Sequence, residues 1–275
     1  MTKTRIPFSG VLRKDLYSFI EKAFFFSQEE KLNPANRYAE YMSYVLTQFV
    51  KGDIKRLLIN VPGRHLKTFI CSICVPAFML GQNPHLRFMI VAYDLSLAED
   101  IVRQIREIMN SKWYKAIFKG TRISSKHAQK DDFEVEGGGR VRAVPIGSLT
   151  GKGGDIIIFD DPHNTNDWDN PRKKEDVIEK FSTLMTRRNH GAKTPVLVVC
   201  HRIAEDDLSA HILEHNNFEH LCLPLFAPED MEFEMGEDTW HLAKGEALRP
   251  DAYPSDEIED TRRNHQGSPF WLHFQ

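Results

Sequence analysis

Two kinds of hydrophobic pattern alternate along the chain. Short, almost wholly apolar runs are typical of strands buried on both faces of a parallel sheet, and apolar residues every three or four positions are typical of amphipathic helices. The short runs predict strands at residues 57–61, 87–92, 155–159, 195–200 and 219–223. The longer segments predict helices at residues 36–50, 68–80, 95–111, 172–188 and 206–214. This alternation predicts an α/β fold, a mostly parallel sheet with helices on both faces.

Three further segments lie outside this alternation. The first 30 residues, with the cluster Phe24-Phe25-Phe26, predict an amphipathic helical segment. Residues 133–135 and 140–144 flank a glycine stretch and predict a hairpin. After Pro224 the chain is predicted to be irregular, with its acidic residues in a loop as solvated charge. These acidic residues are Glu229, Asp230, Glu232 and Glu234.

The domain division follows from these segments. We expect an N-terminal helical segment at residues 1–35, the α/β core at 36–225 and a C-terminal extension at 226–275. The 275 residues are 41% hydrophobic and 27% charged, which is ordinary globular usage and excludes wholesale disorder. No apolar run approaches the ~20 residues that span a bilayer, so we expect no membrane partner.

The charge balance limits how the chain could meet nucleic acid. The net charge is −3 and the isoelectric point about 6.5, so no global positive field attracts DNA. Any DNA contact must therefore be local, and short basic clusters occur at Arg172-Lys173-Lys174 and Arg187-Arg188. Such short runs are also common on plain solvated faces.

The cysteines are expected to have a structural role and not to form a metal site. Cys71 and Cys74 form a CxxC motif, but it lies in an apolar helical stretch without a second pair at metal-binding spacing. We expect buried structural thiols, with a redox pair as the alternative.

A candidate phosphate loop follows the strand at residues 57–61. In such loops, backbone N–H groups at a helix N-terminus converge on phosphates, a lysine neutralises charge and a Ser or Thr hydroxyl reaches Mg²⁺. The usual GxxxxGK[ST] pattern would place glycines at Val61 and Leu66, so the assignment depends on the strand before the loop and the helix after it. An ordinary turn is the alternative. The candidate nucleotide-binding residues are Pro62, Gly63, Arg64, His65, Leu66, Lys67 and Thr68.

An acidic pair ends the apolar strand at residues 155–159. Asp160 is placed to hold Mg²⁺ together with the Thr68 hydroxyl or through water, and Asp161 to orient or deprotonate an attacking water. Asp161-Pro162 could instead cap a turn. The two half-motifs in this order predict ATP hydrolysis, with ATP and Mg²⁺ bound.

Together these segments resemble the large terminase subunits of tailed bacteriophages, the motors that pump DNA into procapsids. The matching stretches are residues 57–68, 91–100, 147–162, 200–208 and 245–250, with the ending Phe274-Gln275. The resemblance implies a P-loop NTPase fold of the ASCE type. It also implies catalytic roles for Asp161, Lys67 and Arg64.

The sequence departs from that family at three positions. Leu66 stands where a small residue is usual, and Asp161 stands where related motors often carry Glu. His201 replaces a Thr or Ser that couples the γ-phosphate to motion, so we expect the coupling role at His201 or Arg202, with a structural role at the strand end as the alternative.

The resemblance further implies partners and a longer protein. These partners are double-stranded DNA, the portal protein of the procapsid and the small terminase subunit, in the host cytoplasm. A homo-oligomeric ring, a pentamer when assembled, is expected, with a monomer as the alternative in isolation. Adenine contacts are expected near Asn36, Arg37 and Tyr38, and candidates for an arginine finger acting on a neighbouring subunit are Arg142, Arg187 and Arg188.

The sequence therefore predicts the ATP-hydrolysing motor domain of a DNA-packaging terminase. The family's ribonuclease-H-like nuclease domain is not expected within these residues. Two alternatives stay open: a helicase-like ATPase that remodels nucleic acid, and a nucleotide-binding module that does not hydrolyse.

Overall fold

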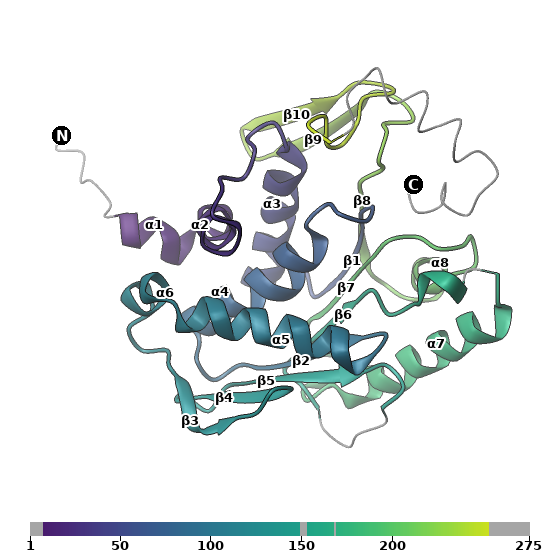
Figure 1. The fold of residues 1–275 in the computed structure, drawn as a ribbon. Helices are drawn as coiled ribbons and strands as arrows, with labels where there is room; N and C mark the ends of the chain where they lie inside the picture. Colours follow the sequence, from purple (N-terminus) through teal and green to yellow (C-terminus); the bar gives the residue numbers. More distant parts are fainter. Residues whose placement is uncertain (1–7, 149–152, 168, 253–275) are drawn as a thin grey trace, which may run out of the picture.

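The computed structural model describes residues 8–148, 153–167 and 169–252 (Figure 1). Part of the glycine-rich stretch that precedes the acidic strand, Leu149 to Lys152, lies outside the described residues, as does the ending Phe274-Gln275.

The core is an eight-stranded sheet with the order β3-β4-β5-β2-β6-β7-β1-β8. From β5 to β8 every neighbouring pair is parallel, while β4 pairs antiparallel with β5 and β3 with β4. The parallel strands are β5 (Arg140–Pro145), β2 (Arg87–Ala92), β6 (Ile156–Asp160), β7 (Val196–Cys200), β1 (Arg56–Asn60) and β8 (Glu219–Cys222). The other two are β4 (Asp132–Val135) and β3 (Ile123–Ala128). The predicted mostly parallel sheet and the predicted hairpin are confirmed.

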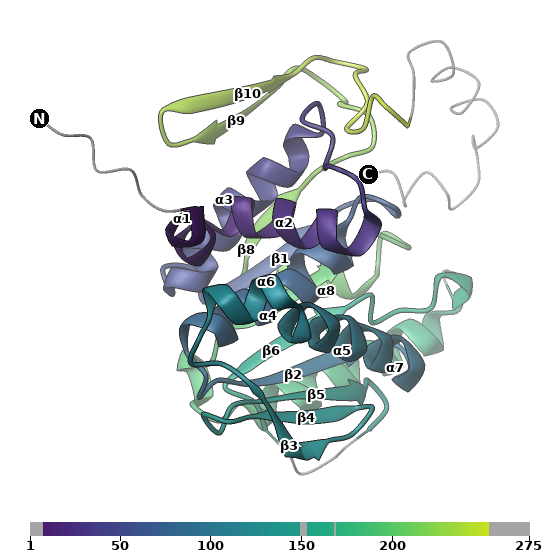
Figure 2. The ribbon, with the colours of Figure 1, turned by 60° about the vertical axis from the view of Figure 1, so that its left-hand side comes forward.

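The central strands are apolar on both sides because each side faces its own core. In β6, Ile156 and Ile158 belong to the larger core, whereas Ile157 and Phe159 belong to the smaller one. Helices α7 (Pro171–Leu184) and α8 (Leu208–His215) cover the smaller core. The remaining helices cover the larger core on the other face, as Figures 1 and 2 show. Helices on both faces of the sheet are thus confirmed.

The helices of the larger core are α1 (Phe8–Lys14), α2 (Leu16–Gln28), α3 (Arg37–Lys51), α4 (Val75–Gln82), α5 (Leu95–Asn110) and α6 (Lys112–Ile117). Helices α3 and α5 agree closely with the ranges predicted from the sequence. Helix α3 ends at Gly52, whose φ of 85° is left-handed and favours glycine. Short 3-10 turns occupy η2 (Thr165–Asp167), η3 (Met185–Arg187) and η4 (Gly191–Lys193). The predicted end of the helix at residues 172–188 is therefore a 3-10 turn.

The predicted helix at residues 68–80 is divided. Its first part is a π-helix, η1 (Thr68–Cys74), followed by α4. Pro76 has no N–H to donate, so it interrupts the α-helical ladder, and the Val75 N–H donates to the Ile70 carbonyl five residues back. Local widening of this kind often occurs at functional sites.

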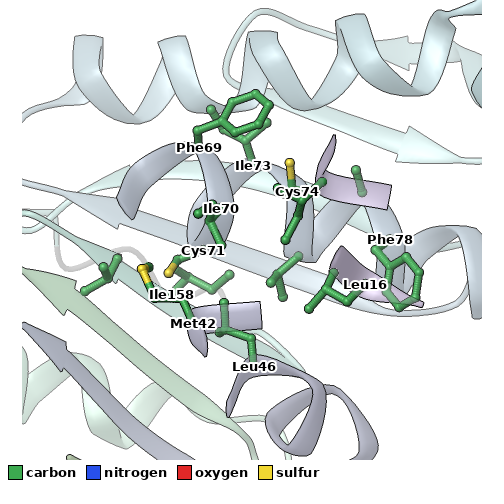
Figure 3. Packing of buried hydrophobic residues seen from close by; sticks show 14 of the residues in the cluster. Leu16, Met42, Leu46, Phe69, Ile70, Cys71, Ile73, Cys74, Phe78 and Ile158 are labelled. Atoms are coloured by element: carbon green, nitrogen blue, oxygen red, sulfur yellow. The ribbon is translucent and has the colours of Figure 1, made fainter. Parts of the chain in front are cut away.

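Both cysteines of the CxxC motif lie in this segment and are fully buried (Figure 3). Burial raises the pKa of the Cys71 and Cys74 thiols well above the ordinary value, so both stay protonated. Figure 3 shows Cys71 directed towards Met42 and Ile158. The expected structural thiols are confirmed.

The segment after Pro224 is not irregular, which corrects the sequence prediction. It contains an antiparallel hairpin of β9 (Met231–Met235) and β10 (Asp238–Leu242) beside α3 (Figure 2). Phe233 stacks on Trp240 with ring centroids 4.6 Å apart and contacts Tyr41 of α3 at 4.9 Å. Glu232 and Glu234 therefore belong to a strand, on either side of the buried Phe233. The sequence of β9 is short and strongly acidic. Its alternation of apolar and acidic residues therefore resembles a solvent-exposed, charged loop.

Candidate nucleotide site

The phosphate loop and the acidic pair meet at one edge of the sheet. Parallel strands place their C-terminal ends at the same edge, where β1 leads into the loop and β6 leads into Asp161. Strand β7 lies between them, with Cys200 paired to Asn60 of β1 and Val199 paired to Asp160 of β6. His201 therefore follows directly between the two half-motifs.

The strand alternation directs Asp160 towards η1. Ile158 faces the core on the η1 side, and Asp160, two residues later, has the same direction. The Thr68 hydroxyl donates to one oxygen of Asp160 at 2.8 Å, and the Ser72 hydroxyl donates to the other. Asp160 is only 4% exposed, and burial together with the neighbouring Asp161 raises the pKa of Asp160 to about 6.

Ser72 is a site residue that the sequence reasoning missed. It lies four residues after Thr68 on the same helical segment, which places both hydroxyls on the side that meets Asp160. A hydroxyl at that spacing after Lys-Thr is the signal that could have identified it.

Asp161 is held by two partners. One of its oxygens lies 2.7 Å from Lys67 Nζ, and the other lies 3.0 Å from His201 Nδ1. Burial opposes ionisation of Asp161, but Lys67 and His201 outweigh it and lower its pKa. Burial likewise disfavours the ammonium of Lys67, but Asp161 and Asp160 outweigh it and raise the pKa of Lys67. The group is therefore a charged lysine between two carboxylates.

The backbone of the loop is strained at two residues, and one of them, Leu66, stands where the usual pattern has glycine. Arg64 has a φ of 62° and Leu66 a φ of 57°, both left-handed, and Asp161 has a φ of 40°. A left-handed conformation costs a non-glycine residue roughly 1–2 kcal/mol, and such strain concentrates at functional sites. The Leu66 side chain packs against the larger core. Leu66 therefore departs from the family in two ways: its side chain is larger than the usual small residue, and its backbone is strained.

Two contacts hold the rest of the loop in place. One is made by His65 within the loop, and the other by Arg249, far along the chain. His65 is buried, its Nδ1 lies 2.7 Å from the Gly63 carbonyl oxygen, and burial lowers its pKa to about 4, so it is neutral. The Arg64 side chain is exposed, while its carbonyl accepts a hydrogen bond of 3.0 Å from Arg249.

Several residues singled out in the sequence lie elsewhere. Arg202 pairs with Asp207 at the start of α8 at 3.0 Å, and not with Asp161. Arg142 pairs with Asp132. Arg187 and Arg188 follow α7, and Arg188 bridges to Gly154 just before β6 begins. These three arginine-finger candidates therefore lie towards the opposite end of the sheet from Lys67.

The side chains expected to contact adenine are buried or paired with other residues of the chain. Tyr38 is fully buried and meets the His65 ring edge-on at 5.5 Å, and Asn36 is 5% exposed. Arg37 pairs with Glu40 and with Asp238 of β10.

The donor set fits Mg²⁺ bound together with a nucleotide. In the described part of the chain, no group of three or more His, Cys, Asp or Glu side chains could hold a metal ion. Thr68 and Asp160 supply hard oxygen donors beside an excess of buried negative charge, and Mg²⁺ takes its remaining ligands from water and phosphate oxygens.

No helix in the described residues is long and apolar enough to cross a membrane. The chain matches no protein-family model, and no curated protein matches it in sequence. Solved structures do resemble it. A mutant ATPase domain of the large terminase from Thermus phage P74-26 aligns with a TM-score of 0.51 and 14% identity, covering 81% of this chain and 87% of that domain.

A large terminase from a thermophilic bacteriophage, solved in complex with ADP, aligns with a TM-score of 0.50 and 11% identity. The alignment covers 83% of this chain and 52% of that terminase, so the chain spans about half of that protein's length. At these identities the likeness concerns the fold. The chain thus has the P-loop NTPase fold of the ATPase domains of phage large terminases.

Proposed function

We propose that this edge of the sheet binds and hydrolyses ATP. The observation that carries the proposal is the convergence of Lys67 and Thr68 from the loop with Asp160 and Asp161 from β6. The buried Lys67, the buried Asp160 and the half-buried Asp161 beside a helix N-terminus suit a phosphorylated ligand, because the loop N–H groups and Lys67 stabilise negative charge.

Each side chain has a separate task in this proposal. Lys67, Arg64 and the loop amides neutralise the β- and γ-phosphates, and Thr68 and Asp160 hold Mg²⁺, which neutralises phosphate oxygens when bound. Asp161 orients the attacking water and accepts its proton, once the phosphate draws Lys67 away from it. His201 keeps the Asp161 carboxylate in position and is suited to sense the γ-phosphate because it ends the strand between the two half-motifs.

We further propose that hydrolysis drives packaging of double-stranded DNA. The support is the fold shared with large terminase ATPase domains, together with the sequence resemblance. In this proposal the core at residues 36–225 acts in the host cytoplasm as a ring with the portal protein and the small terminase subunit, and an arginine from a neighbouring subunit completes the site. Arg142, Arg187 and Arg188 are the candidates for that arginine.

The test is the ATPase rate of the chain alone, with DNA, and with DNA plus procapsids that carry the portal. Stimulation that requires the portal supports the packaging motor. Stimulation by DNA alone selects a helicase-like ATPase, and ATP binding without turnover selects a nucleotide-binding module. A rate per subunit that stays flat as protein concentration rises through assembly removes the trans-acting arginine.

A further inference from the structure

The segment that follows β6 contacts the segment that follows β7 at two points. At the first, His201 Nδ1 lies 3.0 Å from an oxygen of Asp161, and the His201 N–H donates to the same oxygen at 3.2 Å. At the second, the N–H of Leu208, the first residue of α8, donates to His163 Nε2 at 3.0 Å. His163 is only two residues from Asp161, so both contacts involve one short stretch of the chain.

The second contact depends on a neutral imidazole. His163 is 8% exposed, and burial lowers its pKa to about 4, so Nε2 accepts the hydrogen bond while Nδ1 carries the proton. The N–H groups in the first turn of a helix have no acceptor within the helix, and the Leu208 N–H is one of them. His163 is therefore the acceptor that joins the beginning of α8 to the segment after β6.

Residues 202–207, between the two contacts, form a closed loop. Arg202 Nε lies 3.1 and 3.0 Å from the two oxygens of Asp207, a residue that is 1% exposed. Asp207 also accepts hydrogen bonds from the N–H groups of Ile203 in the loop and Ala210 in α8, at 3.0 and 3.1 Å. Because hydrogen bonds to a charged group are the stronger ones, we expect the loop and the first turn of α8 to move as one body.

Pro162 limits the freedom between Asp161 and His163. The proline ring fixes one backbone dihedral, so fewer rotations can absorb a backbone change at Asp161 before it reaches His163. Asp161 itself has a left-handed φ of 40°, a conformation that persists only where the surroundings support it. On the other side, the buried Lys174 of α7 pairs with Asp206, so α7 is joined to the same closed loop.

We propose that His163 is a positioning residue that transmits a change at Asp161 to α8. The inference rests on the proposed function, because it takes Asp161 to lose its pairing with Lys67 when the phosphates bind. Asp161 then changes its orientation, His163 follows through Pro162, and the loop at residues 202–207 moves with the start of α8. Nucleotide binding at one edge of the sheet thereby reaches α7 and α8, the helices that cover the smaller core.

Hydrogen–deuterium exchange of the α8 amides, with and without the slowly hydrolysed analogue ATPγS and Mg²⁺, tests this transmission. The variants are His163→Leu, which removes the acceptor, and His163→Gln, whose side-chain oxygen takes the place of Nε2. His127→Leu is the matched control, because His127 is a half-buried histidine whose Nε2 lies 3.1 Å from Arg140 in the cluster around Asp132. Isothermal titration calorimetry verifies that each protein binds ATPγS.

In the wild type, ATPγS should change the exchange rates of the first-turn amides of α8 by about fivefold or more, the lower end of usual coupling between two sites. His163→Leu should still bind ATPγS but lose this change, whereas His163→Gln and the control should keep it. A merely structural role would give a different result, because exchange in His163→Leu would then rise by the same factor with and without ATPγS.

A wild type that binds ATPγS without any change in α8 exchange would overturn the transmission, and this measurement needs no substitution. So would a nucleotide-dependent change that persists in His163→Leu, or a His163→Gln protein that behaves like His163→Leu. A wild type that does not bind ATPγS instead overturns the proposed function, so the two failures are distinguishable.

Discussion

The two ends of the parallel sheet carry ion clusters that differ in charge balance. At the C-terminal end, two carboxylates, Asp160 and Asp161, share the single lysine Lys67. Towards the N-terminal end, Asp132 of β4 accepts hydrogen bonds from both Arg140 and Arg142 of β5, and Glu134 of β4 also pairs with Arg140. The first cluster has an excess of negative charge, whereas the second has two carboxylates for two guanidinium groups.

The backbone differs in the same way. The C-terminal end contains left-handed residues at Arg64, Leu66 and Asp161, whereas Asp132, Arg140 and Arg142 lie in regular strands with negative φ. Strain and uncompensated charge persist where a ligand relieves them, while a fully paired cluster in a regular strand contributes to stability. This difference supports the proposed ligand site at the C-terminal end of the sheet and a stabilising role for the cluster around Asp132.

The largest expected effect is on turnover. Lys67→Ala should lower the ATPase rate about a hundredfold or more, because it removes the charge that stabilises the phosphates. Steady-state phosphate release measures this effect. Lys130→Ala is the control, since Lys130 is exposed and pairs with Glu99. A folded Lys67→Ala protein with unchanged turnover would falsify the site.

Removing one carboxylate at each end should give opposite results in unfolding experiments. Asp132→Asn should lower the free energy of unfolding by about 2 kcal/mol, because it leaves two partly buried guanidinium groups with poorer partners. Asp160→Asn should not lower it, because burial and Asp161 already raise the pKa of Asp160. Urea denaturation measures both. Equal destabilisation of the two variants would contradict the comparison.

The difference between wild type and Asp132→Asn should depend on pH. Burial opposes ionisation of Asp132, but Arg140 and Arg142 outweigh it and lower its pKa below the ordinary 3.8. A carboxyl group with a lowered pKa stabilises the folded state above its unfolded pKa and loses that contribution as pH falls through the folded pKa. The difference in unfolding free energy should be full at pH 7 and shrink below about pH 3.8. A difference that grows on acidification would refute the assignment.

The smallest expected effect concerns the strained loop. Leu66→Gly should be more stable than Leu66→Ala by about 1 kcal/mol, because both lose the same packing but only glycine tolerates the positive φ freely. Thermal unfolding of the two variants measures the difference. Equal stability would indicate that the loop relaxes out of the left-handed conformation.

Much of this site can be predicted from the sequence, because strands buried on both faces appear as continuous apolar runs. The apolar runs identified the parallel strands, and Lys67, Thr68, Asp160 and Asp161 follow two of them directly. The antiparallel edge strand β3 and the helix α6 were not predicted. Strand β3, with the sequence Ile-Ser-Ser-Lys-His-Ala, is mostly polar and solvated, so it carries no apolar run.

Local sequence determined which segments are strands and helices, and which side chains end them. Only the tertiary structure decided which of those ends are neighbours. Strand β7 lies between β1 and β6, so His201 reaches Asp161, and the widened η1 brings Ser72 to Asp160. The fold likewise brings His163 to the start of α8. Secondary structure follows from contacts within a few residues, whereas strand order and helix packing depend on how the whole chain buries its apolar surface.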